Sequence, residues 1–170
     1  ESTNADTNNA VLTEVNLTDG SVVRRSNPLP IKHCNTLSYD NGIIYTCYTE
    51  GGVTSIYKVS YSTLTLVETV TCIIPEVVHA MDVYNGEMYV GNMNHIYKLD
   101  DNLDVVEVIT LDYGKLNTDV YNTYQGFKIH NDKIYATSFH PNCIFTFNLD
   151  GELENIGYID CELLYLGEPE

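Results

Sequence analysis

The sequence predicts an all-β protein built from repeated four-stranded antiparallel sheets. Three observations lead to this fold class. Short runs alternate apolar and polar residues, helical periodicity is nowhere sustained, and similar segments return about every 45 residues. Alternation with a period of two is the pattern of a strand that buries one face.

Turn dipeptides mark the repeat. Asn41-Gly42, Asn85-Gly86 and Asn131-Asp132 begin 44 and 46 residues apart, and a tyrosine follows each pair closely (Tyr45, Tyr89 and Tyr135). Asn and Gly tolerate positive φ, so such a pair between two apolar runs indicates a tight hairpin. Each copy therefore begins with two strands joined by a short turn.

Two further strands complete each copy. The third strand of each aligns Tyr57 and Tyr97 with Phe147, and a polar turn then leads to a fourth strand. The strand-like segments are LSY, IIYTCY, SIYKV and LTLVETV in the first copy, MDV, EMYVGN, HIYKL and DVVEVIT in the second, and FKI, KIYATSF, IFTFNL and LENIGYI in the third.

The N-terminal region matches only the last half of a copy. Val15 aligns with Phe147, the pair Asp19-Gly20 aligns with Asp150-Gly151, and a fourth strand follows at 22–24. After Ile159 the sequence CELLYLGEPE has room for one strand, at 162–166. The count is therefore about 3.5 units.

Four short antiparallel strands at this period are typical of a β-propeller blade, which buries its faces against neighbouring blades. We expect a polar segment at 1–10, a propeller domain at 11–166 with a half blade at 11–25 and blades at about 35–72, 79–111 and 125–160, and a tail at 167–170. Two architectures remain open. One is a compact four-bladed propeller with an irregular closing blade. The other is an open arc completed by another chain, where two arcs of 3.5 blades would make seven.

The second copy resembles YVTN and NHL propeller repeats, in which a "-YV-N-" strand precedes an "I--ID" strand. The residues concerned are MYVGN at 88–92 and IYKLD at 96–100, and the resemblance covers about residues 35–160. It implies a propeller fold and, as one alternative, a fragment of a calcium-dependent propeller hydrolase or lactonase. Equivalent first-strand positions hold Ser38, Asp82 and Lys128, where such an enzyme would need recurrent acidic or Asn ligands.

The acidic net charge of the chain argues against some classes of binding partner. The net charge is −16, from 24 acidic and 8 basic residues, so the surface repels phosphate backbones and anionic lipids. We expect no nucleic-acid binding, and no apolar run reaches the roughly 18 residues of a membrane-spanning helix. Cations or basic partners would be attracted.

Several features indicate an extracellular or secreted protein. Asn16 opens an Asn-Leu-Thr glycosylation triplet, lysines are few, and the start ESTNADTNNA is polar. Five cysteines occur without a Cys-x-x-Cys pair, and an odd number leaves at least one thiol free or paired between chains.

No cofactor and no catalytic residue are predicted. Asp100, Asp101 and Asp104 are the only candidate calcium ligands, and their turn lacks the spacing and the distal Glu of an EF-hand. The five histidines do not occupy equivalent repeat positions. Adjacent strand residues such as His33 and Cys34 point to opposite faces, so they do not form a nucleophile–base pair. No Gly-x-Ser-x-Gly motif occurs.

The connection DYGKLNTDVYNTYQG is the predicted binding segment. It is an insertion between the second and third copies, and insertions in repeat proteins often carry binding. Tyrosine with Asn and Gln suits glycan or protein contacts through stacking and hydrogen bonding. The candidate residues are Tyr113, Tyr121, Asn122, Tyr124 and Gln125.

The preferred function is a non-enzymatic extracellular propeller module for protein or glycan recognition and assembly. Self-association or assembly with another chain is expected, because the strand count leaves a blade unfinished. One alternative is a structural subunit of a filament or surface assembly through strand exchange. The other is the calcium-dependent hydrolase fragment named above.

Overall fold

The structure is a computed structural model that describes residues 9–32, 36–78, 80–92, 94–114, 124–138 and 142–159. The regular elements of these residues are all strands. They are β1 (Thr13–Val15), β2 (Val22–Arg25), β3 (Ser38–Asp40), β4 (Ile43–Glu50), β5 (Val53–Ser60), β6 (Thr65–Cys72), β7 (Ala80–Tyr84), β8 (Glu87–Gly91), β9 (His95–Leu99), β10 (Val105–Thr110), β11 (Tyr124–His130), β12 (Lys133–Ser138), β13 (Cys143–Asn148) and β14 (Leu153–Tyr158).

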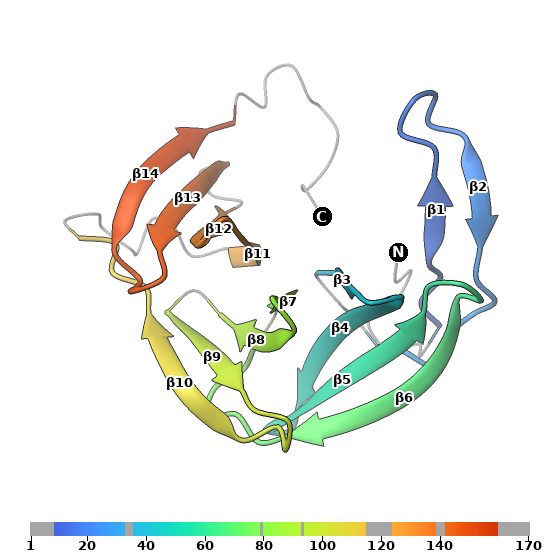
Figure 1. The fold of residues 1–170 in the computed structure, drawn as a ribbon, viewed down its shortest axis with the longest axis horizontal. Coiled ribbons are helices and arrows are strands. Elements are labelled where there is room, and N and C mark those ends of the chain that lie inside the picture. Colours follow the sequence, from blue (N-terminus) through green and yellow to red (C-terminus); the bar gives the residue numbers. More distant parts are fainter. Residues whose placement is uncertain are drawn as a thin grey trace.

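The strands form three four-stranded antiparallel sheets and one two-stranded sheet, each in chain order. We call β3–β6 blade 1, β7–β10 blade 2, β11–β14 blade 3, and β1–β2 the N-terminal hairpin. The blades surround a central axis with their first strands innermost, and the described arc is open between blade 3 and the hairpin (Figure 1). The predicted all-β propeller fold is confirmed, in its open form.

The curvature of the arc tests the prediction that two copies of this chain form one seven-bladed ring. In Figure 1 the described strands sweep through more than half of a circle around the axis. Two such arcs would overlap if they lay in one plane. A single flat ring made of two copies is therefore incompatible with this curvature.

The predicted hairpin turns have the expected backbone. Both central residues of each turn have positive φ, as a type I′ turn requires. The values are 45° and 83° at Asn41 and Gly42, 53° and 82° at Asn85 and Gly86, and 48° and 57° at Asn131 and Asp132. The choice of Asn, Gly and Asp at these positions thus sets the pairing of first and second strands.

Strand pairing corrects one part of the sequence alignment. The repeat tyrosines Tyr45 and Tyr89 pair with Lys58 and Lys98, whereas Tyr135 pairs with Thr146. The structural equivalent of Tyr57 and Tyr97 is therefore Phe145, and the predicted match to Phe147 is wrong by two residues. Two residues preserve the alternation of a strand, so the error left the predicted faces unchanged.

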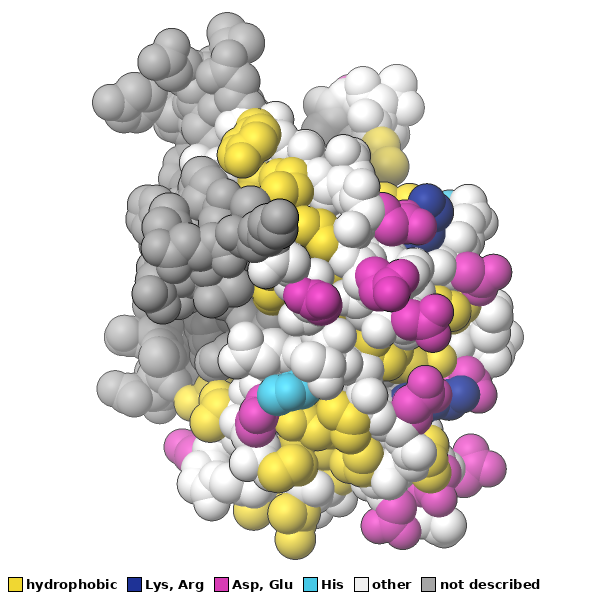
Figure 2. Space-filling model, turned by 90° about the vertical axis from the view of Figure 1, so that its left-hand side faces the viewer, with side chains coloured by type: hydrophobic (Ala, Val, Ile, Leu, Met, Phe, Trp, Pro, Cys, Tyr) yellow, Lys and Arg dark blue, Asp and Glu magenta, His cyan; other side chains and the backbone are white. Residues whose placement is uncertain are grey.

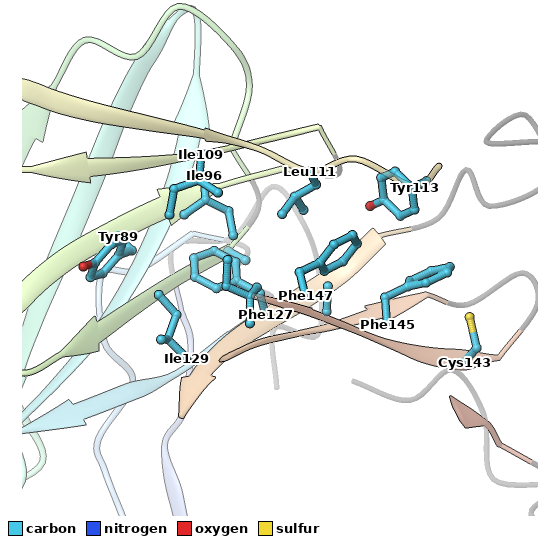
Figure 3. Packing of buried hydrophobic residues seen from close by; sticks show 13 residues of the cluster. Tyr89, Ile96, Ile109, Leu111, Tyr113, Phe127, Ile129, Cys143, Phe145 and Phe147 are labelled. Atoms are coloured by element: carbon cyan, nitrogen blue, oxygen red, sulfur yellow. The ribbon is translucent and has the colours of Figure 1, made fainter. Parts of the chain in front are cut away.

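Apolar clusters lie between the blades. One joins the hairpin region to blade 1, a second lies between blades 1 and 2, and a third lies between blades 2 and 3. In Figure 3, Ile96 and Ile109 of blade 2 lie opposite Phe127 and Ile129 of blade 3. Blades 1, 2 and 3 thus bury apolar surface against one another, and blade 1 also buries it against segments that flank the hairpin, as stacked repeats do.

The blades have two distinct faces, which we name by chain order. The forward face points to the next blade and the rear face to the previous one. Ile56 of blade 1 packs in the cluster with blade 2, so it marks the forward face. Val59 packs in the cluster with Leu29 and Ile31, beside the hairpin, so it marks the rear face.

The surface is polar and acidic. Figure 2 shows Asp and Glu side chains spread over one side of the molecule, with Lys and Arg sparse on the same side. This agrees with the net charge of −16. Among the described residues no helix has the length and apolar character to cross a membrane.

Gly151 yields a test of blade packing. It has a φ of 86°, and a Cβ placed there would lie 2.1 Å from the carbonyl oxygen of Thr110 in blade 2. Its counterpart Gly20 has a φ of 71° with open space around it. We expect Gly151→Ala to lower the thermal midpoint clearly and Gly20→Ala to have only the smaller cost of the strained φ, about 1–2 kcal/mol. Equal losses in thermal unfolding would contradict this packing.

Candidate functional site at the axis

Three first-strand residues meet at the centre of the arc. Ser38 of β3, Asp82 of β7 and Lys128 of β11 pair with Tyr45, Tyr89 and Tyr135, so they occupy equivalent positions in the three blades. The strands that carry them, β3, β7 and β11, lie nearest to the centre of the arc in Figure 1. We call these three residues the axial cluster.

The carboxylate of Asp82 holds the axial cluster together. The Ser38 hydroxyl donates to Oδ1 at 2.6 Å, and the Lys128 ammonium also binds Oδ1. The backbone N–H of Val83 donates to Oδ1 at 2.9 Å, and that of Ile129 donates to Oδ2 at 2.7 Å. Asp82 is 0% exposed, so these contacts replace its hydration.

The donors on Asp82 decide what the axial cluster can bind. A carboxylate has about four lone-pair sites, and four donors already engage this one. Calcium needs six to eight oxygen ligands. The axial cluster supplies one occupied carboxylate and one hydroxyl, with an ammonium beside them. These residues do not fit the calcium site of a propeller hydrolase.

Lys128 is the solvent-facing member of the axial cluster. Its side chain is 54% exposed, although Nζ also lies 3.3 Å from the Ser38 hydroxyl. An ammonium has three N–H donors. The arrangement can therefore link three blades through Asp82 and still offer a cationic donor to a group that enters the axis.

A second polar cluster joins the connection between blades 1 and 2 to the β8–β9 turn. Oε2 of Glu76 accepts from the Asn92 amide at 2.6 Å and lies 3.0 Å from Nδ1 of His95. The Asn92 carbonyl oxygen accepts from the backbone N–H of Asn94 and of His95. Glu76 thus links the connection between β6 and β7 to the β8–β9 turn of blade 2.

Titration of Glu76 gives a pH prediction. Hydrogen bonds from Asn92 and His95 hold the pKa of Glu76 below its ordinary value of 4.5, against a smaller opposing effect of burial. A folded-state pKa below the unfolded value stabilises the fold above pH 4.5, and this contribution disappears as pH falls through the folded pKa. We expect Glu76→Gln to lose stability relative to the parent at pH 7 and to lose less at pH 3. Urea unfolding at both values measures this, with Glu107→Gln on exposed β10 as control.

The predicted binding residues divide into two groups. Tyr113 is 5% exposed, and its ring lies edge-on to Phe145 and Phe147 at 5.2 Å from each (Figure 3). Burial raises its pKa. Tyr113 is therefore a core residue, and we leave it out of any binding surface. Tyr121 and Asn122 lie outside the described residues, as do the side chains of Tyr124 and Gln125 at the start of β11; their role stays a prediction.

The candidate calcium turn has a local structural role. Oδ1 of Asp100 accepts from the backbone N–H of Asn102 at 2.8 Å and from that of Asp104 at 2.9 Å. In the described part of the chain, no three His, Cys, Asp or Glu side chains are grouped as a metal site requires. Asp101 and Asp104 thus belong to a turn whose geometry Asp100 fixes.

The cysteines and histidines add no reactive pair to the described residues. Cys47, Cys72 and Cys143 are buried. Burial raises the pKa of Cys72 and of Cys143, which lowers the fraction of reactive thiolate. His33 and Cys34, which the sequence did not indicate as a catalytic pair, lie outside the described residues, as do Cys161, His79 and His140.

Comparisons with known proteins support the fold. No family model and no curated protein matches the sequence, so the resemblance to YVTN and NHL repeats stays a prediction. Glutaminyl cyclase from Myxococcus xanthus is similar in structure, with 13% identity and a TM-score of 0.66 over 86% of this chain and 61% of that one. A protein of unknown function from Bacteroides caccae has 11% identity and a TM-score of 0.52 over 88% and 58%.

These similarities lie at the level of architecture. The chain spans less than two thirds of each of these solved chains. At such low identity the similarity shows the fold alone. The neighbours are propeller-type folds, and the described part of this chain is an open set of propeller blades.

Proposed function

We propose that this chain is a non-enzymatic propeller module that recognises and assembles with other proteins or glycans. The observation that carries the proposal is the open end of the arc at blade 3. The forward faces of blades 1 and 2 are covered by the next blade, whereas that of blade 3 borders the gap in Figure 1. No blade among the described residues covers this face, and an exposed apolar surface of this kind supports a role in binding a partner.

The polar clusters support binding rather than catalysis. Both oxygens of Asp82 accept from groups of the protein itself, and Oε2 of Glu76 is engaged by Asn92 and His95. A general base needs an acceptor directed at the substrate. The described carboxylates of both clusters serve as links between elements instead.

Partner binding tests the proposal directly. We expect the purified chain to bind in a glycan array or to associate in sedimentation velocity at micromolar concentration. The double variant Tyr121→Ala, Tyr124→Ala should weaken glycan binding at an unchanged thermal midpoint. A chain that stays monomeric on concentration and binds no glycan would refute the proposal.

An extracellular location is part of the proposal, and Asn16 provides its test. Asn16 and Thr18 are exposed at the start of the β1–β2 turn, where Oδ1 of Asn16 accepts from the backbone N–H of Thr18 at 2.8 Å. An exposed triplet in a turn is accessible to glycosylation. We expect secretion from a eukaryotic host to add a glycan that Asn16→Gln removes, read as a mass difference. An unmodified secreted chain would contradict this.

The second candidate is a structural subunit that assembles through its sheet edges. The outermost strands β2, β6 and β10 carry exposed valines, including Val22, Val67 and Val106. Edge strands have unpaired backbone groups that can extend a sheet into another chain. Fibres visible by electron microscopy after concentration would favour this candidate.

A further inference from the structure

Building on the proposed function, we infer that the gap takes a further four-stranded blade from a partner polypeptide. The inner strand of that blade brings a carboxylate or carbonyl oxygen to Lys128. Three sets of residues define the partner: the forward face of blade 3, the rear face of the N-terminal hairpin, and the axial cluster.

The forward face of blade 3 repeats an interface that is buried elsewhere. Ile56 pairs with Cys47, Ile96 with Gly91 and Ile144 with Thr137, so these three isoleucines are equivalent. Ile56 and Ile96 are 0% exposed under the next blade, while Ile144 is partly exposed. Tyr89 is likewise buried, and its equivalent Tyr135 is partly exposed. Both residues of blade 3 occupy core positions that no blade of the described residues covers.

The hairpin presents the complementary half of the same interface. Val59, Leu99 and Phe147 pair with the start of the fourth strand, as Val15 pairs with Val22. The first three residues are at most 4% exposed on their rear faces, whereas Val15 is 46% exposed. At one end of the described arc, blade 3 therefore exposes the forward side of the repeating interface. At the other end, the hairpin exposes the rear side.

The axial cluster specifies the chemistry of the inner strand. Along the arc the equivalent residues are a donor (Ser38), an acceptor (Asp82) and a donor (Lys128). Lys128 pairs with Tyr135, so it lies on the forward face, which borders the gap. An acceptor on the inner strand of the next blade would continue the alternation and accept a further N–H of the Lys128 ammonium, whose side chain is 54% exposed, because charge-assisted hydrogen bonds are the strong ones.

A second copy of this chain does not suit the gap. The described arc exceeds half a circle, so the remaining sector is too small for another arc of the same kind (Figure 1). A single blade, with strands that complete the hairpin sheet, continues the existing interfaces on both sides.

The experiment supplies such a blade in a known form. Blade 2 already covers a forward face through its rear face, and it carries the acceptor Asp82. We extend the full chain after Glu170 with a duplicate of residues 73–112. The thermal midpoint should rise by several degrees, and Asp82→Leu in the duplicate alone should remove part of this rise.

Matched substitutions locate the contact. Ile144→Asp should lower the midpoint strongly in the extended chain and weakly in the parent, whereas Val106→Asp on the outer strand β10 should act equally in both. As a second measurement, Ile144→Cys should react with a thiol reagent about tenfold more slowly in the extended chain. Equal effects of Ile144→Asp in both chains, or equal labelling rates, would overturn the inference.

Two further outcomes would overturn it. Oligomers of the parent that dissociate on Ile144→Asp would show that a second copy occupies the face. Slow labelling of Ile144→Cys in the monomeric parent would show that the chain covers the face itself. The proposed function and this inference can fail independently. The binding assays test the proposed function, whereas the thermal midpoint and labelling rate of the extended chain test the inference.

Discussion

Asp82→Ala is expected to destabilise the fold by about 2–4 kcal/mol, because loss of a buried acceptor leaves its donors unsatisfied at about 1–3 kcal/mol for each group. The substitution leaves the backbone N–H groups of Val83 and Ile129 without their carboxylate acceptor inside the protein. It also removes the acceptor shared by Ser38 and Lys128, through which blade 2 is linked to its two neighbours. All three blades lose a common contact, so we expect lower cooperativity as well as a lower midpoint in urea unfolding.

Two substitutions separate these contributions. Asp82→Asn keeps one side-chain acceptor and should recover part of the stability, since the amide oxygen can still accept a hydrogen bond. Asp101→Ala, in the exposed β9–β10 turn, should change stability by no more than about 0.5 kcal/mol. If Asp82→Ala proved as mild as Asp101→Ala, the axial cluster would not connect the blades.

Local sequence signals predicted the fold because each one has a local cause. The positive φ of Asn41, Asn85 and Asn131 is a property of the turn residues themselves. The alternation that follows each turn decides which side of the strand becomes buried. Three copies of one pattern then required stacked sheets, since a single four-stranded sheet cannot cover its own faces.

The sites were harder to predict because they join elements that are distant in sequence. Ser38, Asp82 and Lys128 were recognised as equivalent positions, but their hydrogen bonds depend on how blades rotate around the axis. Glu76 and His95 lie in connections that the repeat does not specify, so their contact had no sequence signal. Tyr113 follows the last strand of blade 2 and packs in the apolar cluster between blades 2 and 3. The Tyr, Asn and Gln content of this segment indicated a binding loop and gave no sign of this packing.

Phe147→Ala should cost about 3–5 kcal/mol, the usual range for removal of a fully buried phenylalanine. Phe147 is 0% exposed in the cluster between blades 2 and 3, and its ring meets that of Tyr113. A cavity there loses contacts on both blades, because rigid sheets on either side cannot collapse into it. Since domains of this kind are stable by only about 5–15 kcal/mol, a large fall in the midpoint of urea unfolding is expected.

Val15→Ala is the matched control, because Val15 occupies the position of Phe147 at the open end of the arc. With 46% of its surface exposed, Val15 has little packing to lose, and we expect a change below about 1 kcal/mol. Val59→Ala removes the same two methyl groups at the equivalent position of blade 1, where the side chain is 1% exposed, so the contrast between the two valines measures what packing against a neighbouring element contributes. If Val15→Ala were as costly as the core substitution, the rear face of the hairpin would already be covered and the arc would be closed in solution.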